Sequence, residues 1–298
     1  YQFLAFFTFI VFTNWPMNIL ADMYGGAPVL STIYTVATLI CIITELVLTR
    51  YIGKIKSVKK MSVIFGIITL ISALAIMLIP PSNLVLWQIF YFLVTLFSII
   101  YCTFSVGILV GQWFPRRKGT FMGIATLAFP IGNGLIGVFA GTVFAKGYPD
   151  VFGAFLPYFI VALIGLLVGT IFTADYPEQV GAYRDNDKSL TLEMAKAMME
   201  QEIENKRTSV WTLKNTFASR DFWFITIPMG ALLMMSVGMM TQTMSIIGTY
   251  PELPFAAIMG LVMICACIGS YVLGLIDTKF GTRWAILISV IIMIISGI

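Results

Sequence analysis

The sequence has no histidine among its 298 residues and only 14 acidic side chains. Without imidazole, the chain can supply neither a histidine metal ligand nor a histidine general acid or base. Its four cysteines all lie within apolar runs, so the sequence indicates no disulfide framework. Nor is there a spacing of cysteines and carboxylates that is typical of a metal site. We therefore expect neither a metal nor another cofactor.

Charge of either sign is scarce, because only 11% of the residues are charged whereas 59% are hydrophobic. A soluble domain carries about 25% charged residues. Apolar runs of roughly 20 residues without a central charge are typical of helices that cross a bilayer. The sequence therefore predicts an all-α integral membrane protein with nine transmembrane helices, at residues 1–21, 29–49, 61–79, 85–112, 120–144, 152–174, 222–247, 255–276 and 284–298.

Half of the scarce charge is concentrated in one segment, residues 175–221, which holds 16 of the 32 charged residues. We interpret it as a linker between an N-terminal six-helix bundle at 1–174 and three further helices at 222–298. Apolar residues recur at helical spacing over 190–206 and again over 210–217, which predicts amphipathic helices. Such a helix is either solvated, with one weakly apolar side, or interfacial, lying on the inner leaflet.

The basic residues of the short loops predict which side of the membrane each loop occupies. Loops 49–60, 113–119 and 277–283 are rich in Lys and Arg, whereas the loops between them contain a single basic residue, Lys146. Short loops of this kind stay cytoplasmic, so we expect these three loops and the linker inside. Individual residues expected inside are Lys56, Arg117 and Lys196, and those expected outside are Ser82 and Glu252.

Two of the predicted spans carry their polar side chains on a single helical face, at steps of three and four residues. Because lipid cannot hydrogen-bond these groups, the faces must look at protein or at water. They are either contacts that join helices or the lining of a solute path. The third, sixth and ninth spans lack such faces, so we expect them to face lipid. The residues on the faces are Ser31, Tyr34, Thr38, Cys41 and Glu45 in the second span, and Gln88, Tyr91, Thr95, Ser98, Cys102, Ser105 and Gln112 in the fourth.

Two loops carry the most distinctive motifs. Gln112-Trp-Phe-Pro-Arg-Arg-Lys-Gly119 joins the fourth and fifth spans; its proline ends a helix and its basic trio suits the inner headgroups. The fifth span is rich in glycine, and Gly137-Val-Phe-Ala-Gly141 is predicted to be a small-xxx-small seam where helices approach closely. The loop Gly274-Leu-Ile-Asp-Thr-Lys-Phe-Gly-Thr-Arg283 contains Asp277, which is expected to pair with basic groups or cap a helix start.

These loops, together with six spans, a long linker and a second set of spans, resemble the major facilitator superfamily. The Trp-Phe-Pro junction and the glycine-rich fifth helix are most similar to its branch of oxalate/formate and other monocarboxylate carriers. The resemblance implies two helical bundles around a central cavity, and alternating-access transport of a small solute such as a small organic anion. It implies that the chain is a fragment lacking the last three of twelve helices. We expect a monomer in a prokaryotic inner or cell membrane, with solute and lipid as partners and no nucleic acid.

The expected solute site is a central cavity near the membrane midplane, where carriers of this kind bind between their repeats. Aligning Gly53 with Gly281 gives an offset that pairs Asn14 with Gln242, so amides are predicted at matched heights in the two halves. The predicted lining comprises Asn14, Asn18, Tyr34, Tyr91, Thr95, Ser98, Tyr101, Asn133, Met235 and Gln242. The predicted gating loops comprise Arg116, Arg117, Gly119, Asp277, Lys279, Gly281 and Arg283.

Two other classes of function stay open from the residues alone. A channel-like protein or a sensor that does not transport would have a similar pattern of spans. An intramembrane enzyme would need a positioned acid, base or nucleophile, and the only acid well inside a span is Glu45. No Lys or Arg lies at mid-membrane in the predicted spans. Members of the resembled family that carry phosphorylated or nitrate-like anions tend to use such arginines. The resemblance therefore argues against those substrates, unless the missing helices supply the cation, and we expect a neutral or weakly anionic ligand held by amides and hydroxyls.

Overall fold

The computed structural model of the chain contains helices and connecting turns, and no strand, in the residues that it describes, which are 1–51, 55, 57–145, 149–187, 189, 191–207, 213–248 and 255–296. Side chains at 206, 207, 213, 236–248, 255, 256, 259 and 296 are outside the description. The helices are α1 (Gln2–Phe9), η1 (Ile10–Asn14), α2 (Trp15–Ile19), η2 (Ala21–Met23), α3 (Ala27–Arg50), α4 (Val58–Leu78), η4 (Pro81–Asn83), α5 (Leu84–Trp113), α6 (Lys118–Thr126), α7 (Ala128–Gly134), α8 (Ile136–Val143), α9 (Val151–Phe172), η5 (Pro177–Val180), η6 (Arg184–Asn186), α10 (Leu192–Arg207), α11 (Leu213–Ala218), α12 (Arg220–Gly248), α13 (Phe255–Phe280) and α14 (Thr282–Ser296).

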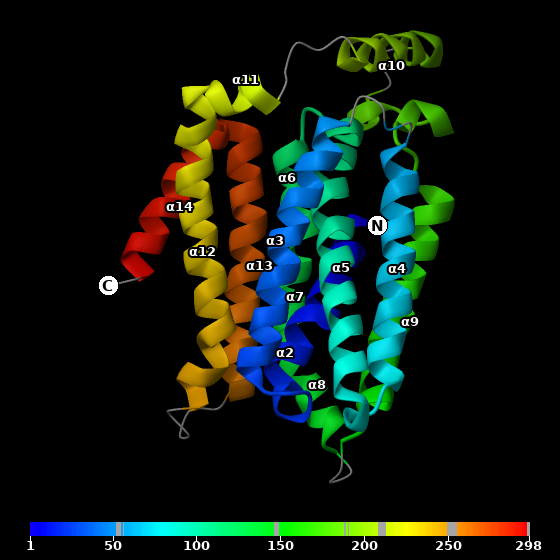
Figure 1. Cartoon of the computed structure of the whole chain (residues 1–298). Coiled ribbons are helices and arrows are strands. Elements are labelled where there is room, and N and C mark those ends of the chain that lie inside the picture. Colours follow the sequence, from blue (N-terminus) through cyan, green and yellow to red (C-terminus); the bar gives the residue numbers. More distant parts are fainter. Residues whose placement is uncertain are drawn as a thin grey trace.

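Helical structure occupies every predicted span, and the long helices run side by side (Figure 1). Within the described residues, six helices are long and apolar enough to cross a membrane: Ala27–Arg50, Val58–Leu78, Pro81–Trp113, Lys118–Val143, Val151–Phe172 and Gly260–Phe280. The other predicted spans correspond to the broken helix at the N-terminus, α12 and the shorter α14. Six spans are therefore supported by length and composition, and the full set of nine stays a prediction.

The loops gather at two opposite ends of the bundle, as the alternation of charge predicts. At one end, the Lys59 amide donates to Asp175 Oδ1 (2.8 Å) and the Trp113 indole donates to the Ala174 carbonyl (2.9 Å). Figure 1 shows α10 crossing beyond this end. At the other end, the Tyr24 hydroxyl donates to the Ile79 carbonyl (3.3 Å). The basic loops and the linker therefore share one end of the molecule.

The first span is not a continuous α-helix, because the π-helical segment η1 separates α1 from α2. Pro16 is the second residue of α2, just after this segment, and a proline inside a helix removes one backbone hydrogen bond. Such π segments appear mostly as single turns, frequently at functional sites. The Thr13 carbonyl of η1 accepts a hydrogen bond from the Tyr91 hydroxyl at 2.9 Å.

The expectation that the third, sixth and ninth spans face lipid holds only in part, because α3, which is the second span, is more exposed than α4, which is the third. Only Leu30, Ala37 and Cys41 of α3 are buried, whereas nine residues of α4 are. The threonines of α3 explain why it tolerates an apolar environment: the Thr32 and Thr44 hydroxyls, for example, donate to carbonyls four residues earlier (2.8 Å each). Hydroxyls satisfied within their own helix need no partner from a neighbouring one.

The fifth span is divided into α6, α7 and α8, with breaks at Leu127 and Leu135. The first break lies close before Pro130, which supplies no amide hydrogen to the helix. The predicted close seam at Gly137–Gly141 is not found at its second glycine, since a Cβ at Gly141 would meet no atom of the described residues within 4 Å. The close approaches of this span lie earlier, at Gly119 and Gly123.

Candidate functional site

Among the described residues, the seam between α6 and α13 is the main contact between the first six predicted spans and the last three. A Cβ at Gly123 would lie 2.8 Å from the Ser270 carbonyl oxygen, and one at Gly274 would lie 2.8 Å from the Gly119 carbonyl oxygen. Backbone atoms cannot move aside as a side chain can, so only glycine fits at these positions. The two helices therefore touch backbone to backbone along this seam.

Hydroxyl groups hold the same seam together across its length. The Thr120 and Thr278 hydroxyls lie 2.8 Å apart, and the Thr120 amide donates to the Thr278 hydroxyl at 3.0 Å. One turn and a half further along, the Thr126 and Ser270 hydroxyls lie 3.0 Å apart. All of these side chains are short, and no ion pair joins α6 to α13 within the described residues. The contact is thus shape-complementary and weakly polar.

Asp277 was predicted to lie in a gating loop, but the structure places it in the last turn of α13, where it contributes to this seam. A Cβ at Gly119 would lie 2.0 Å from Asp277 Oδ2, so the carboxylate occupies the space that the glycine leaves. Gly281 ends α13 in the left-handed region (φ +90°) and its amide donates to the Asp277 carbonyl (3.0 Å). Asp277 was expected to pair with basic groups or to cap a helix start. Within the described residues it forms no ion pair with Lys279 or Arg283, and it lies inside α13 rather than at a helix start. Both basic side chains are exposed.

The polar face of α5 contacts the first span and the turn that follows it. Ser105 and Gln2 are hydrogen-bonded (3.2 Å), Tyr91 donates to the Thr13 carbonyl (2.9 Å), and Gln88 donates to the Tyr24 carbonyl (3.2 Å). These pairs run antiparallel along the two segments. This part of the face therefore joins helices, one of the two interpretations that the sequence left open.

The predicted cavity residues of α5 are all buried. Tyr91, Thr95 and Ser98 have no exposed surface. Thr95 and Ser98 donate to carbonyls of their own helix, at 2.8 and 3.1 Å. Tyr101 packs edge-on against the Tyr1 ring (5.9 Å between centroids), and its ring lies against Gly66 of α4. Tyr101 thus occupies the interior of the first six helices.

The remaining predicted cavity residues are less enclosed. Asn14, Asn18 and Tyr34 are half-buried; Asn18 donates to the Asn14 carbonyl at 2.7 Å. Asn133 of α7 donates to the Phe129 carbonyl at 2.9 Å. Met235 of α12 is 54% exposed. The side chain of Gln242 lies outside the described residues, so the predicted match between Gln242 and Asn14 is not tested.

Comparison with protein families decides the class of the molecule. The family model described as Major Facilitator Superfamily matches residues 2–298, nearly the whole chain. The chain belongs to the Major Facilitator Superfamily. Comparisons with curated proteins and with solved structures gave no match. The predicted family is therefore confirmed.

Membership of this superfamily, together with the apolar helices, makes the chain an integral membrane protein that transports small solutes. Members of the superfamily are transporters rather than enzymes. The α6–α13 seam then joins helices from the two sets of spans that the linker separates. The sequence signalled this seam only through the two loop motifs that flank it, at Gly119 and Asp277.

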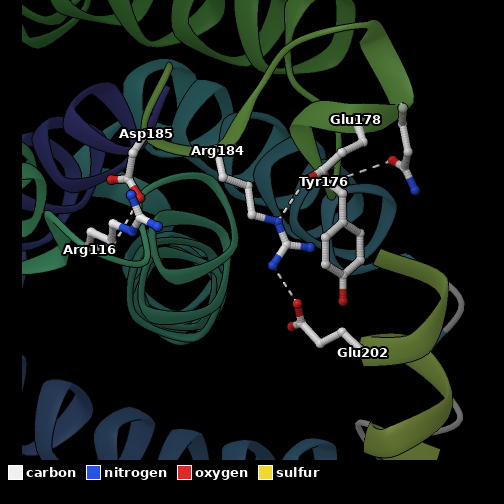
Figure 2. Close-up of polar contacts among 7 residues, drawn as sticks. Arg116, Tyr176, Glu178, Arg184, Asp185 and Glu202 are labelled. Atoms are coloured by element: carbon white, nitrogen blue, oxygen red, sulfur yellow. Dashed lines mark hydrogen bonds and ion pairs between the residues drawn. The ribbon is translucent and has the colours of Figure 1, made fainter. Parts of the chain in front are cut away.

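The linker contains an ion cluster that the sequence did not predict. Arg184 Nε donates to Glu178 Oε1 (2.7 Å) and its Nη1 pairs with Glu202 Oε2 of α10 (2.5 Å). Figure 2 shows these three side chains converging beside the Tyr176 ring, over which the Arg184 guanidinium lies at 5.4 Å. Burial lowers the pKa of Arg184, but hydrogen bonds to Glu202 and Glu178 outweigh it, and the net shift is upward. The only feature of the sequence that pointed to this ion cluster is the mixture of acidic and basic residues in 175–221.

The linker is also attached to the loop between α5 and α6. Arg116 Nη1 pairs with Asp187 Oδ2 at 2.9 Å, and the Arg116 amide donates to Asp185 Oδ2 at 3.1 Å. The Ser189 hydrogen bonds, followed by the charge of Arg116, hold the pKa of Asp187 below its usual range. Arg116 therefore contacts the linker rather than α13, and Arg117 is exposed.

Proposed function

We propose that this chain carries a small solute by alternating access, with the α6–α13 seam as the contact that closes one end of the pathway. The observation that carries the proposal is the glycine contact of Gly119 and Gly123 with Gly274. Backbone contact between small residues excludes water without long interlocking side chains. Such an interface can separate and re-form at low cost, which alternating access between rigid bundles requires.

The domains follow the linker in this proposal. Residues 1–174 form the first six-helix bundle, 175–221 the cytoplasmic linker, and 222–298 the first three helices of the second bundle, giving nine transmembrane helices of the family's twelve. The shared end of the basic loops and the linker supports this orientation, since such loops stay on the cytoplasmic side. The seam would then close the cytoplasmic end.

The solute is proposed to be neutral or a small organic anion, of the kind that the oxalate/formate branch carries. Among the predicted cavity residues, Asn14 and Tyr34 keep polar atoms available. Neither Asn14 Nδ2 nor the Tyr34 hydroxyl has a hydrogen-bond partner within the described part of the chain. Both groups donate hydrogen bonds, which suits an oxygen-rich ligand. A weakly charged ligand of this kind does not need a Lys or Arg side chain at mid-membrane.

Counterflow in proteoliposomes tests the proposal. The protein is reconstituted, preloaded with unlabelled oxalate, formate or lactate, and exposed to the labelled solute outside. A carrier gives saturable, transient accumulation of at least one solute, whereas a channel gives equilibration without overshoot and a sensor gives no flux. Absence of counterflow for every solute of an extended panel would reject transport of this class.

The cavity assignment has its own expected outcome. Asn14→Leu should raise the half-saturation concentration for the solute about tenfold, because one hydrogen bond worth about 1.4 kcal/mol is lost. Gln242→Leu should do the same if the two halves are matched as the sequence predicts. The matched control is Asn83→Leu, since that amide is exposed in η4 and is not among the predicted cavity residues. Wild-type affinity in both variants, at normal expression, would remove these amides from the cavity.

A further inference from the structure

Glu45 is an acidic side chain inside a helix that crosses the membrane, and the transport mechanism above does not use it. It lies more than one turn before Arg50, where α3 ends. Among the described residues of the six helices that are long and apolar enough to span a bilayer, the other carboxylate is Asp277, in the last turn of α13. An ionisable side chain within a bilayer is costly, so its presence there indicates a function.

The Glu45 carboxyl group is turned toward α5, which lies beside α3 (Figure 1). The Thr103 hydroxyl of α5 is hydrogen-bonded to Glu45 Oε1. Thr103 lies almost three turns before the end of α5 at Trp113, about 15 Å along the helix. Thr103 is exposed and Glu45 is half-buried, so the pair lies at the surface of the first six helices and is accessible to water when the carrier opens there.

Thr103 can satisfy this carboxyl group in either protonation state. Its hydroxyl is close to Glu45 Oε1 and also to the Ile99 carbonyl of its own helix, at 2.7 Å. A hydroxyl donates one hydrogen and also accepts. When Glu45 is ionised, the hydroxyl donates to the carboxylate. When Glu45 is protonated, the acid donates to Thr103 and the hydroxyl turns to Ile99, so a proton is bound or released by the rotation of one hydroxyl.

The Ile99 carbonyl does not depend on this hydroxyl for a partner. The Cys102 thiol also donates to it, at 3.4 Å. Ile99 therefore stays satisfied when the Thr103 hydroxyl turns to Glu45, and neither position of the hydroxyl leaves a polar group unpaired. The contact is thus suited to a group that changes its protonation state.

No side chain of fixed positive charge neutralises Glu45 within the described part of the chain. The helices α5 and α2 contain no charged residue, and the acid of η2, Asp22, lies at the opposite end of α3. Arg50 lies over the Tyr51 ring, 5.9 Å from its centroid. The described ion pairs do not include Glu45.

The other titratable groups near Glu45 are thiols. Cys41 lies about one turn earlier on the same face of α3, and Cys102 precedes Thr103 on α5. Both thiols are buried, and a thiol is neutral at pH 7. Lys59 and Lys60 begin α4 and make no ion pair with Glu45. A proton is therefore the counter-charge that this environment leaves for the carboxylate.

We propose that Glu45 is a proton-binding site, that Thr103 is its positioning residue, and that the carrier moves one proton together with each solute anion. This proposal rests on the transport function above and names its coupling ion. The proton comes from water on the side to which the site is open and returns to water on the other side. Glu45 is neutral while the site is enclosed, which avoids burying an unpaired charge.

The position of Glu45 on α3 relates the proton to the solute. Glu45 lies on the same face as Tyr34 of the predicted cavity, about three turns away. A movement of α3 can therefore affect both sites. One proton and one monoanion carry no net charge together, so their joint passage suits spans that have no Lys or Arg at mid-membrane.

Uptake driven by a pH gradient tests the coupling. The probe is labelled oxalate, formate or lactate, whichever gives counterflow, and the medium outside the proteoliposomes is made acidic. Protein-free vesicles correct for diffusion of the undissociated acid. For one proton per monoanion, a gradient of one pH unit should raise accumulation by the wild type up to about tenfold. Glu45→Gln resembles the protonated acid, so it should keep counterflow and lose the response to the gradient, and Glu45→Asp should restore part of it.

Thr103→Val and Thr44→Val test the positioning role. Thr103→Val keeps the shape of the side chain but removes the hydroxyl, and should reduce accumulation driven by the gradient at least about threefold, since a hydrogen bond to a charged group is lost. Thr44 lies next to Glu45, and its hydroxyl donates to the Ile40 carbonyl of its own helix (2.8 Å). Thr44→Val should therefore respond to the gradient as the wild type does.

Infrared difference spectra across a pH titration test the site without transport. A carboxylic acid C=O band should appear on acidification, be absent in Glu45→Gln and shift in frequency in Thr103→Val. Wild-type counterflow without a response to pH, an equal response in Glu45→Gln, or a spectrum unchanged in Glu45→Gln would overturn the proton site and leave the proposed function standing. Absence of counterflow in the wild type would reject the proposed function and the coupling together, and the infrared band would still decide whether Glu45 binds a proton.

Discussion

The contacts within the first six predicted spans differ in kind from those between α6 and α13. Within the first set, the long-range hydrogen bonds of Gln2 and Tyr91 join α5 to the first span, and that of Gln88 joins α5 to Tyr24 in the turn that follows. Between the two sets, the contact consists of glycine backbones and short hydroxyls. The first kind fixes one relative position of two helices, since each bond requires a particular register. The second allows helices to part and meet again.

This difference separates a rigid unit from a moving contact. Buried bonds to backbone carbonyls, such as that of Tyr91 to Thr13, are expensive to break because the carbonyl would be left unsatisfied. A glycine seam loses mainly dispersion contacts on opening, and short hydroxyls can turn to carbonyls of their own helix. Thr278 already donates to the Gly274 carbonyl at 3.0 Å. We therefore expect mutations in the two regions to alter different properties.

The largest effect is expected from filling the seam. Gly274→Leu would place side-chain atoms where the Gly119 carbonyl lies 2.8 Å from the Cβ position. Overpacking costs about 1–3 kcal/mol, so the closed seam should be depopulated about tenfold or more. Transport should fall accordingly, with Tm of the protein nearly unchanged. Gly269→Leu is the control on the same helix, since a Cβ there meets nothing within 4 Å. Equal transport by both variants would contradict the assignment of the seam.

An intermediate effect, on stability rather than on the transport cycle, is expected from the first set of spans. Tyr91→Phe leaves the buried Thr13 carbonyl without its donor, which should cost about 1–3 kcal/mol of unfolding free energy. Tyr158→Phe is the matched control, because Tyr158 makes ring contacts with Trp15 and has no recorded hydroxyl partner within the described residues. Thermal unfolding in detergent would measure both. If the two variants unfold alike, the hydroxyl of Tyr91 is not a structural bond.

The smallest effect is expected where the linker meets the α5–α6 loop. Asp187→Asn removes an exposed ion pair with Arg116, and exposed pairs contribute little. Because the pKa of Asp187 is lowered from its ordinary 3.8, the ionised pair is present above that pH and is lost only as pH falls through a lower value. Hydrogen exchange of residues 184–189 should therefore rise slightly in the variant, and its protection in the wild type should be constant from about pH 5 to 8. A loss of protection near pH 6 would show that another group controls the linker.

Much of the fold could be predicted from hydrophobic periodicity, since each apolar run became helical and α10 covers Leu192–Arg207, close to the predicted 190–206. The single polar face of α5 was also predicted correctly. The partner of that face could not be predicted, because Ser, Gln and Tyr suit a helix contact and a solute path equally well. Only the distances to Gln2, Thr13 and Tyr24 separate the two.

The glycine seam and the linker cluster show the limits of sequence patterns more clearly. Gly137–Gly141 has the small-xxx-small spacing, yet Gly141 faces open space, while the contacting Gly119 and Gly123 were singled out only as part of a loop motif and a glycine-rich span. Spacing shows that two backbones can approach, and tertiary structure decides where they do. The ion cluster of Arg184 depends on residues from three separate turns of the linker, which no local pattern brings together.

A cross-link across the seam tests the central claim most directly. Thr120→Cys and Thr278→Cys are introduced together, with Cys265 and Cys267 replaced by alanine, and oxidised after reconstitution. The threonine hydroxyls lie 2.8 Å apart, so a disulfide should form readily. The account predicts that counterflow stops on oxidation and returns on reduction, while either single-cysteine variant transports normally. If the fully cross-linked protein transports as fast as the same protein after reduction of the disulfide, the seam does not open during transport and the account is contradicted.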